Sequence, residues 1–363
     1  MSAIPEVDEL LIDSATRLFS DTCSFDAVQA AEAQQWAPSI WQAVAEAGFA
    51  WIGLAEEAGG SGGSLADACE VLRIAGSFAA PVPLAETAML GGWLLTEAGI
   101  ELPEGSVTLV PGITGDSMTT SLNADGSALL SGTAKRVPWA SAADRIAVVV
   151  TDDEGQPVAV AAIAPTESGL SIDQSVNLAG EPRQSVVFDG VTVGSDQVGP
   201  VGAEVGDELR LRGALSRTML SAGALEAMSK LTVEYTEQRH QFGRPVGRFQ
   251  AVQQHLVWGA QDAAIAKMAA QLAARAASVD VVGARFEIAA ARCVAEGAAS
   301  SATRGAHQAH GAMGMTQEYA LHHLSRRLWA WRHEWAVPGE WPAEVGRLVE
   351  AAGADELYPL IAS

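Results

Sequence analysis

The chain changes its hydrophobic period twice along its length, and this change is the strongest constraint on its fold. Through residues 1–104 apolar residues recur at three- to four-residue spacing, as in DELLIDSATRLF, SLADACEVLRIAGSF and ETAMLGGWLLTEAG. This spacing is typical of amphipathic helices. Residues 105–198 instead carry β-branched runs such as ALLSGTAKRV and QSVVFDGVTV, with Asp-Gly and Glu-Gly turns between runs. These runs predict antiparallel strands and hairpins rather than alternating strands and helices.

Helical periodicity returns after the β-branched region. We expect helices over roughly 203–239, 248–278, 281–305 and 316–335, followed by a tail broken by proline. The order of helical, β and helical blocks predicts an α+β fold. We expect an N-terminal helical domain over 1–104, a middle antiparallel β domain over 105–198 and a C-terminal four-helix bundle within 199–363.

Charge and hydropathy narrow the partners that the chain can have. The formal net charge is −22, from 44 acidic and 22 basic side chains, so a nucleic-acid partner is not expected, because phosphate backbones need a basic surface. No apolar run approaches the roughly 20 residues of a membrane span. The N-terminal segment MSAIPEVDELLIDSATRLF is acidic and amphipathic, unlike a signal or transit peptide. We therefore expect no membrane contact and a cytoplasmic location.

Two local patterns could indicate a dinucleotide-binding loop and a metal site, but a structural role explains each of them better. The GGSGG run at 59–63 follows a predicted helix rather than a strand, so we interpret it as a flexible connection and not as a dinucleotide loop. The pairs His307–His310 and His322–His323 lack a cysteine or carboxylate at zinc spacing. No metal site is expected.

Two further segments contain breaks in otherwise helical patterns. The first is TEQRHQFGRPVGRFQAVQQHL at 236–256, and the second is QAHGAMGMTQEYALHHLSRR at 308–327. Each taken alone is compatible with a corner between two helices, with glycine as the C-cap. Glycine at such a turn also lets a backbone approach a ligand closely.

Taken together and in order, five segments resemble the acyl-CoA dehydrogenase family of flavoproteins over essentially the whole chain. The segments are LAEEAGGSGGS, LSGTAKRVPWASAADRIAVV, EPRQSVVFDGVTV, YTEQRHQFGRPVGRFQAVQQHL and QAHGAMGMTQEY. The resemblance implies FAD as cofactor, bound between the β domain and the C-terminal helices of one chain. It also implies that a neighbouring chain holds the adenosine and pyrophosphate end of that FAD.

By position, the resemblance assigns five residues to a neighbour's FAD. Arg239 would pair with the pyrophosphate, and Phe242 would pack beside the adenine. Gln308 and the turn at Gly311 and Ala312 would offer polar and backbone contacts to the same end. The residue types suit these roles, because a guanidinium matches phosphate oxygens and glycine permits close approach.

The implied reaction is α,β-desaturation of an acyl-CoA thioester, in which a carboxylate base removes the α proton and the flavin takes hydride from the β carbon. The positions of that base depart from the family pattern. Counted from Arg326, the usual base position is Trp335, and its neighbour Glu334 would point about 100° away if both were helical. The alternative base position is Gly213, with Glu208 five residues earlier. We therefore assign no catalytic residue, with Glu334 as the only fallback.

The β domain departs from the family pattern at the flavin as well. Trp139 stands where the resemblance leads us to expect a threonine that contacts the flavin. The segment VPGITGDSMTTS at 110–121 replaces the family's usual flavin-binding segment. The chain thus keeps the residues lent to a neighbour and lacks those expected to perform the chemistry.

The favoured hypothesis is a subunit of a heteromeric, FAD-dependent acyl-CoA dehydrogenase. A homologous partner would complete a heterotetramer and supply the base and the flavin pocket, with an electron-transfer acceptor reoxidising the flavin. The acyl-CoA would come from steroid side-chain degradation or fatty-acid β-oxidation. One alternative is a self-sufficient homo-oligomeric acyl-CoA dehydrogenase, and another is a non-catalytic scaffold of the same fold.

Overall fold

The chain forms two compact units in a computed structural model that describes residues 7–112, 115–337 and 339–362. One unit combines the chain up to Phe25 with Cys69–Ala80 and everything from Ala214 onward; the other combines Asp26–Ala68 with Pro81–Gly213. The first six residues of the acidic N-terminal segment, and residues 113–114 of the 110–121 segment, lie outside the described residues.

The second unit contains two four-stranded sheets, which confirms the predicted β region. One sheet has the order β1-β4-β5-β8 and the other β2-β3-β7-β6. All neighbouring strands are antiparallel except β1 and β4, which are parallel. The bounds are β1 Val107–Leu109, β2 Thr119–Leu122, β3 Ala128–Pro138, β4 Arg145–Thr151, β5 Pro157–Ile163, β6 Leu170–Asp173, β7 Arg183–Val193 and β8 Val198–Pro200.

A single apolar core joins the two sheets. It contains Leu130, Val148, Ala161 and Phe188, all at most 2% exposed. The expected turns close two of the hairpins: Gly126 lies between β2 and β3, and Gly155 lies between β4 and β5, both with positive φ. Burial alternates over much of β3 and β7, as in a sheet with one buried face, whereas consecutive residues are buried in β1 and in most of β5.

The helices of this unit precede the strands. They are α2 (Phe25–Gln34), α3 (Pro38–Glu46), the short turns η1 (Phe49–Trp51) and η2 (Glu56–Ala58), the π-helical η3 (Ala85–Gly91) and α5 (Gly92–Glu97). The glycine-rich loop after η2 folds back on the chain, since Gly53 N donates to Gly62 O at 2.9 Å and Gly62 N donates to Leu54 O at 2.9 Å. The loop is therefore held by main-chain hydrogen bonds and is not the flexible connection that we expected. Its glycine-rich composition gives no sign of these bonds, because they are made by the backbone.

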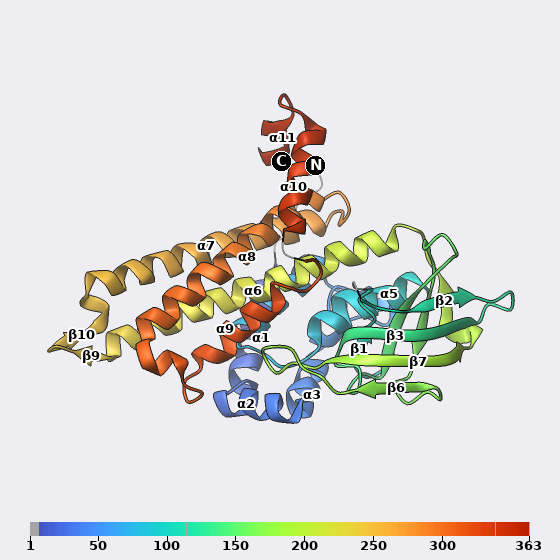
Figure 1. Cartoon of the computed structure of the whole chain (residues 1–363), viewed down its shortest axis with the longest axis horizontal. Helices are drawn as coiled ribbons and strands as arrows, with labels where there is room; N and C mark the ends of the chain where they lie inside the picture. The colour runs from blue at the N-terminus through green and yellow to red at the C-terminus, as the bar shows by residue number, and fades with distance from the viewer. Residues whose placement is uncertain (1–6, 113–114, 338, 363) are drawn as a thin grey trace. The chain divides into compact units, whose positions relative to one another are not determined.

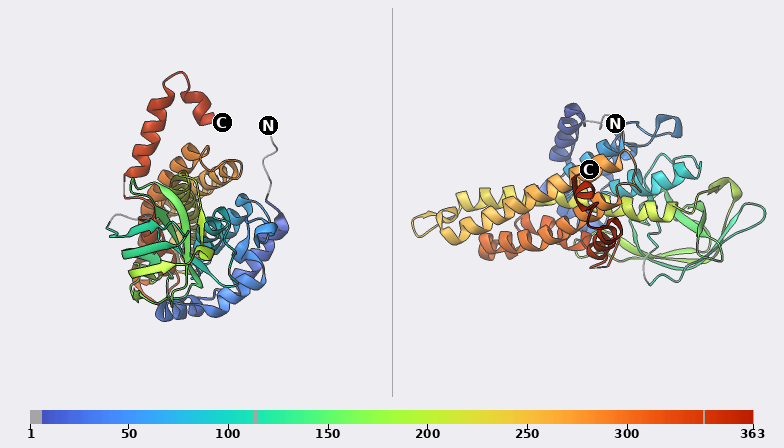
Figure 2. Two further views of the ribbon diagram at one scale, coloured as in Figure 1. Left: turned by 90° about the vertical axis from the view of Figure 1, so that its right-hand side faces the viewer. Right: turned by 90° about the horizontal axis from the view of Figure 1, so that it is seen from above.

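The first unit contains the predicted helical bundle, formed by α6 (Val205–Gln238) from Ala214 onward, α7 (Gln250–Ala277), α8 (Arg285–His310) and α9 (Leu321–Trp331). Helices α6, α7 and α8 run side by side, and a short hairpin projects beyond their end (Figures 1 and 2). The expected helix 316–335 is shorter than predicted, and the tail forms α10 (Glu340–Ala352) and α11 (Leu357–Ala362). Among the described residues, no helix has the length and apolarity of a membrane span.

Two helices of this unit touch through their backbones. These helices belong to the first unit, which includes α1 (Glu9–Thr22) and most of α4 (Leu65–Ser77). A Cβ added to Gly223 on α6 would lie 1.7 Å from Arg73 O, and one added to Gly76 on α4 would lie 2.2 Å from Leu220 O. An ion network surrounds this contact: Arg73 pairs with Glu70 and Glu226, and Lys267 Nζ of α7 lies 2.8 Å from Glu226 Oε1. Only glycine allows the two helices this separation.

Candidate functional site

The break in the first helical segment is a two-stranded hairpin at the end of α6. Arg239 N donates to Tyr235 O at 2.8 Å and ends the helix, and Val246 N then donates back to Arg239 O at 2.7 Å. Between them, β9 (His240–Gln241) pairs with β10 (Arg244–Pro245). The loop residues Phe242 and Gly243 have φ of +52° and +78°, as a tight hairpin turn requires.

Phe242 occupies the tip of this hairpin at a conformational cost. Its side chain is 91% exposed, and a left-handed backbone is unfavourable for a residue with a large side chain. Its ring makes an edge contact with Phe249 at 6.1 Å between centroids, and Arg244 lies over the other ring at 4.2 Å. A strained, exposed aromatic tip adds little to the core of its own chain, which makes Phe242 a candidate for a contact outside the chain.

Arg239 begins the same hairpin and is exposed. Within the described part of the chain its guanidinium makes no ion pair, although the chain has 44 acidic residues. An unpaired guanidinium is free to take an anion, and its fork of N–H donors matches phosphate oxygens.

The second helical break lies at the end of α8. Gln308 is exposed on its last turn, and the short helix η6 (Gly311–Met315) follows at once. Gly311 has φ +59° and ψ −137°, a conformation that other residues rarely adopt. Because no atom lies within 4 Å of where its Cβ would be, the backbone at Gly311 is open to a ligand. Ala312 is exposed beside it.

An aromatic cluster around the buried His310 joins the two breaks, and sequence reasoning missed it. Tyr235 stacks on His310 at 4.4 Å between ring centroids, and Tyr319 contacts both rings, at 5.4 Å and 5.1 Å. Tyr235 lies one helical turn before Arg239, and His310 directly precedes Gly311. The cluster therefore brings Arg239 and Gly311 to the same end of the bundle. Tyr235 directly precedes the first segment and Tyr319 lies in the second, which is the signal that would have identified it.

The surroundings of the histidine at the centre of this cluster favour its neutral form. His310 is 3% exposed, its Nδ1 lies 2.8 Å from Ala306 O, and its Nε2 has no partner among the described residues. Burial lowers the pKa of His310, and burial also lowers the pKa of His307 on the preceding turn. A neutral imidazole stacks between tyrosines without the cost of a buried charge.

This burial predicts a loss of stability on mild acidification. A folded-state pKa below the unfolded value means that the unfolded chain binds more protons below pH about 6.5, so stability falls as the pH drops below that value. We expect the free energy of unfolding, from urea titrations at pH 7.5 and 5.5, to fall less in His310→Phe than in the wild type. His240→Phe, at an exposed hairpin position, serves as control. An equal fall in all three proteins would contradict this assignment.

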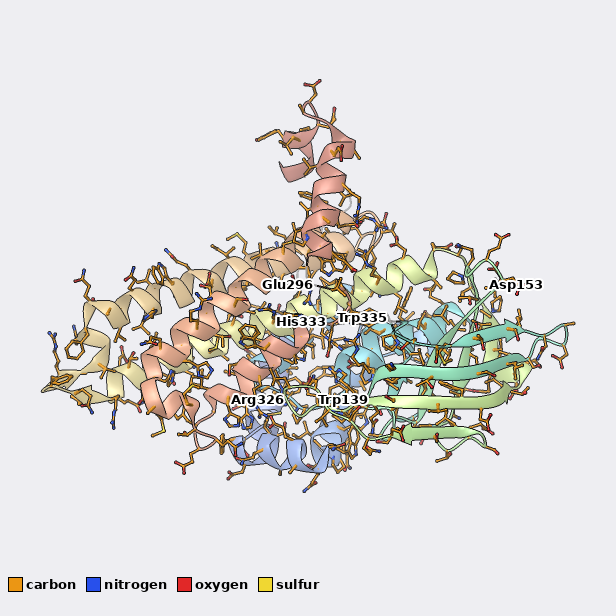
Figure 3. All side chains as sticks on the ribbon, in the orientation of Figure 1. Trp139, Asp153, Glu296, Arg326, His333 and Trp335 are labelled. Atoms are coloured by element: carbon orange, nitrogen blue, oxygen red, sulfur yellow. The ribbon has the colours of Figure 1, made fainter. Side chains whose placement is uncertain are left out.

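Neither expected base position carries a carboxylate. Gly213 lies within α6 and is buried, and the nearby Glu208 accepts from Arg212 Nε at 2.8 Å. Trp335 follows the end of α9, is half-buried and has φ +66° (Figure 3). The expected rotation of about 100° between Glu334 and Trp335 assumed that both residues are helical. This assumption was wrong, because α9 ends at Trp331.

Glu334, the fallback base, lies in a buried ion-pair network. Its Oε2 accepts from Arg217 Nε at 2.5 Å, and Arg217 is 1% exposed. Its carbonyl accepts from Arg292 Nη2 at 3.1 Å, and the same nitrogen donates to Trp331 O at 2.7 Å. Burial lowers the pKa of Arg292 to about 10, and Glu296 pairs with it at 3.2 Å. The Glu334 carboxylate thus compensates a buried guanidinium.

The side chain of Trp139 in the β domain is buried and packed against a neighbouring side chain, so no open pocket lies at this position. The indole is 4% exposed at φ +43°, and Arg183 Cζ lies 4.8 Å from the ring centroid. Arg183 is itself buried and pairs with Glu181 at 3.2 Å. A stacked indole offers no hydroxyl to a flavin ring, and removing it would expose a buried charge pair. Trp139 thus offers no polar group to an isoalloxazine, whereas the exposed guanidinium of Arg239 has the chemistry that a diphosphate requires.

Comparisons with known proteins agree with the fold. The sequence matches the family models "Acyl-CoA dehydrogenase, N-terminal domain" over residues 5–101 and "Acyl-CoA dehydrogenase, C-terminal domain" over residues 211–332. The acyl-CoA dehydrogenase IpdE2 of Mycolicibacterium smegmatis is 30% identical over 87% of this chain and 90% of its own length.

Solved structures of the same fold cover nearly the whole chain. The ChsE4-ChsE5 complex from Mycobacterium tuberculosis has a TM-score of 0.88 and 22% identity, over 97% of this chain and all of the matched one. A variant of the Tcur3481-Tcur3483 steroid ACAD has a TM-score of 0.84 and 21% identity, over 94% of this chain and 97% of the matched one. At these identities both are likenesses of fold.

Proposed function

The chain belongs to the acyl-CoA dehydrogenase family, whose members are FAD-dependent oxidoreductases acting on CH–CH bonds, and we propose that it serves as the lending subunit of a heteromeric member. Its Arg239 end would hold the adenosine and pyrophosphate of an FAD bound mainly by a homologous partner chain. The observation that carries this proposal is the exposed hairpin, on which Phe242 forms a strained aromatic tip and Arg239 has no ion pair with the residues that the structure describes.

Each residue at this end has a binding task in the proposal. Arg239 pairs with the pyrophosphate, and Phe242 covers one face of the adenine. Gln308 and the main chain at Gly311 and Ala312 donate or accept at the same end. The bound flavin supplies hydride acceptance, while this chain supplies charge neutralisation and exclusion of water from the nucleotide end.

Three observations favour a subunit that contributes contacts to a partner's FAD over an enzyme that works without a partner. Gly213 and Trp335 have no group that takes a proton, Glu334 is engaged with Arg217, and Trp139 lies under Arg183. The proton acceptor and the isoalloxazine pocket are therefore assigned to the partner. The substrate class is an acyl-CoA thioester, and its acyl group would be a steroid side chain or a fatty acyl chain.

Removing Arg239 tests the proposal in the co-expressed complex. A charge-assisted hydrogen bond contributes about 1.5–3 kcal/mol, so Arg239→Ala should weaken FAD binding about 10- to 100-fold. The readout is the ratio of flavin to protein absorbance after gel filtration, with Arg17→Ala on α1, an exposed arginine, as control. We expect the lone chain to be colourless. Unchanged FAD in Arg239→Ala would favour a scaffold, and stoichiometric FAD with turnover in the lone chain would favour a homo-oligomeric enzyme.

A further inference from the structure

His310 lies between the two helix breaks to which the nucleotide contacts are assigned. Its imidazole stacks on Tyr235, one helical turn before Arg239, and it directly precedes Gly311. The short helix η6 lies tightly against the same residue, because a Cβ added to the buried Gly314 would lie 2.8 Å from His310 Cβ. A single side chain therefore contacts both the end of α6 and the turn that follows α8.

The stack accommodates only one proton on this imidazole. His310 Nδ1 lies 2.8 Å from Ala306 O, and because a carbonyl only accepts, Nδ1 carries the proton of the neutral ring. A second proton would be on Nε2, which is buried and has no hydrogen-bond partner among the described residues. A positive charge there has no acceptor, and attraction to the tyrosine faces offsets only part of this cost. Burial accordingly lowers the pKa of His310.

The titratable groups around His310 come from three parts of the chain. His307 lies one turn earlier on α8, and burial lowers its pKa as well. Tyr319 follows η6, and burial raises the pKa of its hydroxyl, so it stays neutral. From α6 come Tyr235 and the exposed Glu234, whose carboxylate lies 4.0 Å from a lysine amine on the same helix. Helix η6, GAMGM, carries no titratable side chain. A second proton on His310 therefore meets no buried counter-charge among the described residues.

We propose that His310 is the positioning residue that holds Arg239 and the turn at Gly311 in one arrangement, and that a second proton on its imidazole separates them, so that mild acid releases FAD. The inference rests on the proposed function, because it takes Arg239 and Gly311 as contacts to the nucleotide. In the neutral state the stack fixes the end of α6 against η6. Once charged, the imidazole is better solvated by water than by the stack, and it leaves the stack. Arg239 and the backbone at Gly311 then lose the support that sets their separation, and the affinity for FAD falls.

The pH dependence of FAD binding tests this proposal in the co-expressed complex. The dissociation constant is measured between pH 7.5 and 5.0 by diluting the loaded complex and recording the fluorescence of the released flavin. Below the pKa of His310, the wild-type dissociation constant should rise by a factor that approaches about ten per pH unit, because release is coupled to the uptake of one proton. His333→Phe is the matched control and should follow the wild type. Burial lowers the pKa of His333 too, but this residue lies beyond α9 and outside the cluster (Figure 3).

Two substitutions of His310 separate the role of its ring from the role of its charge. His310→Ala removes the stack and should raise the dissociation constant about two- to tenfold at every pH, which is the contribution of an aromatic pair. His310→Phe restores a ring that takes no proton, so it should recover most of that loss and show no rise on acidification. An acid-induced rise that persists in His310→Phe would overturn the proposal. So would tighter wild-type binding in acid, the sign expected if a charged imidazole attracted the pyrophosphate.

Hydrogen exchange in the same complex reports on the two helix breaks directly. In the wild type, peptides covering 236–249 and 311–320 should lose protection together between pH 7.5 and 5.5, after correction for intrinsic exchange rates, and His310→Phe should keep it. The readouts also separate this inference from the proposed function. Unchanged FAD in Arg239→Ala would overturn the proposed function itself. A wild-type pH profile in His310→Phe, with FAD lost in Arg239→Ala, would overturn only the role of His310.

Discussion

Glu334→Gln is expected to lower the free energy of unfolding by about 3–5 kcal/mol, because it removes the negative charge that compensates a buried guanidinium. Arg217 is 1% exposed, and its Nε lies 2.5 Å from Glu334 Oε2. The amide that replaces the carboxylate still accepts a hydrogen bond but carries no charge. Guanidinium chloride titrations followed by far-UV circular dichroism measure the change.

Two further variants separate the structural role of Glu334 from a catalytic one. Glu237→Gln, at an exposed position of α6, should leave stability unchanged. Arg217→Met combined with Glu334→Gln should recover much of the loss, because a buried ion pair can often be replaced by apolar groups at little cost. A base in a self-sufficient enzyme behaves differently: Glu334→Gln would then abolish turnover and leave the unfolding free energy at the wild-type value.

Gly223→Ala is the second substitution for which we expect a large effect, a loss of about 3 kcal/mol or more. The added methyl carbon would lie 1.7 Å from Arg73 O and 2.9 Å from Ser77 N, and both are backbone atoms that no rotamer change can move aside. Helix α4 would have to shift off α6, which strains the surrounding core and the Arg73 ion network.

Gly346→Ala on α10 is the matched control, because no atom lies within 4 Å of the added carbon. Alanine in an open helix interior should stabilise the chain by up to about 1 kcal/mol. Thermal denaturation of the two variants should therefore move in opposite directions from the wild type. A Gly223→Ala protein as stable as Gly346→Ala would show that α4 and α6 do not pack backbone to backbone.

The sequence was sufficient for the class and order of the elements because periodicity is a local property. Helical spacing predicted α6, α7 and α8 to within a few residues, and the β-branched runs predicted β3, β4, β5 and β7. The end of α9 was missed because no glycine marks it: Trp331 is followed by Arg332, which a helix also accepts. The parallel β1–β4 pair was missed because pairing direction depends on how distant segments meet.

In the candidate site, too, features that depend on local sequence were predicted and contacts between distant residues were not. Arg239, Phe242, Gln308 and Gly311 are predictions from the resemblance, which depends on residue type and position. The Arg217–Glu334 pair and the stack of Arg183 on Trp139 were not predicted, since each joins residues that lie far apart in the chain. The pairing of Arg217 with Glu334 matters most here. Because of it, the unfolding free energy and the turnover of Glu334→Gln distinguish a structural role of Glu334 from a role as catalytic base.

The exposed tip of the hairpin has a consequence for the abundance of the protein in a cell. A copy made without its partner displays Phe242 on a strained turn, and chaperones and proteases recognise exposed apolar surface of this kind. Excess copies would be removed while assembled ones are protected. Under the proposed assembly, the scarcer of the two subunits therefore sets the amount of complex, and no separate device is needed to match their synthesis.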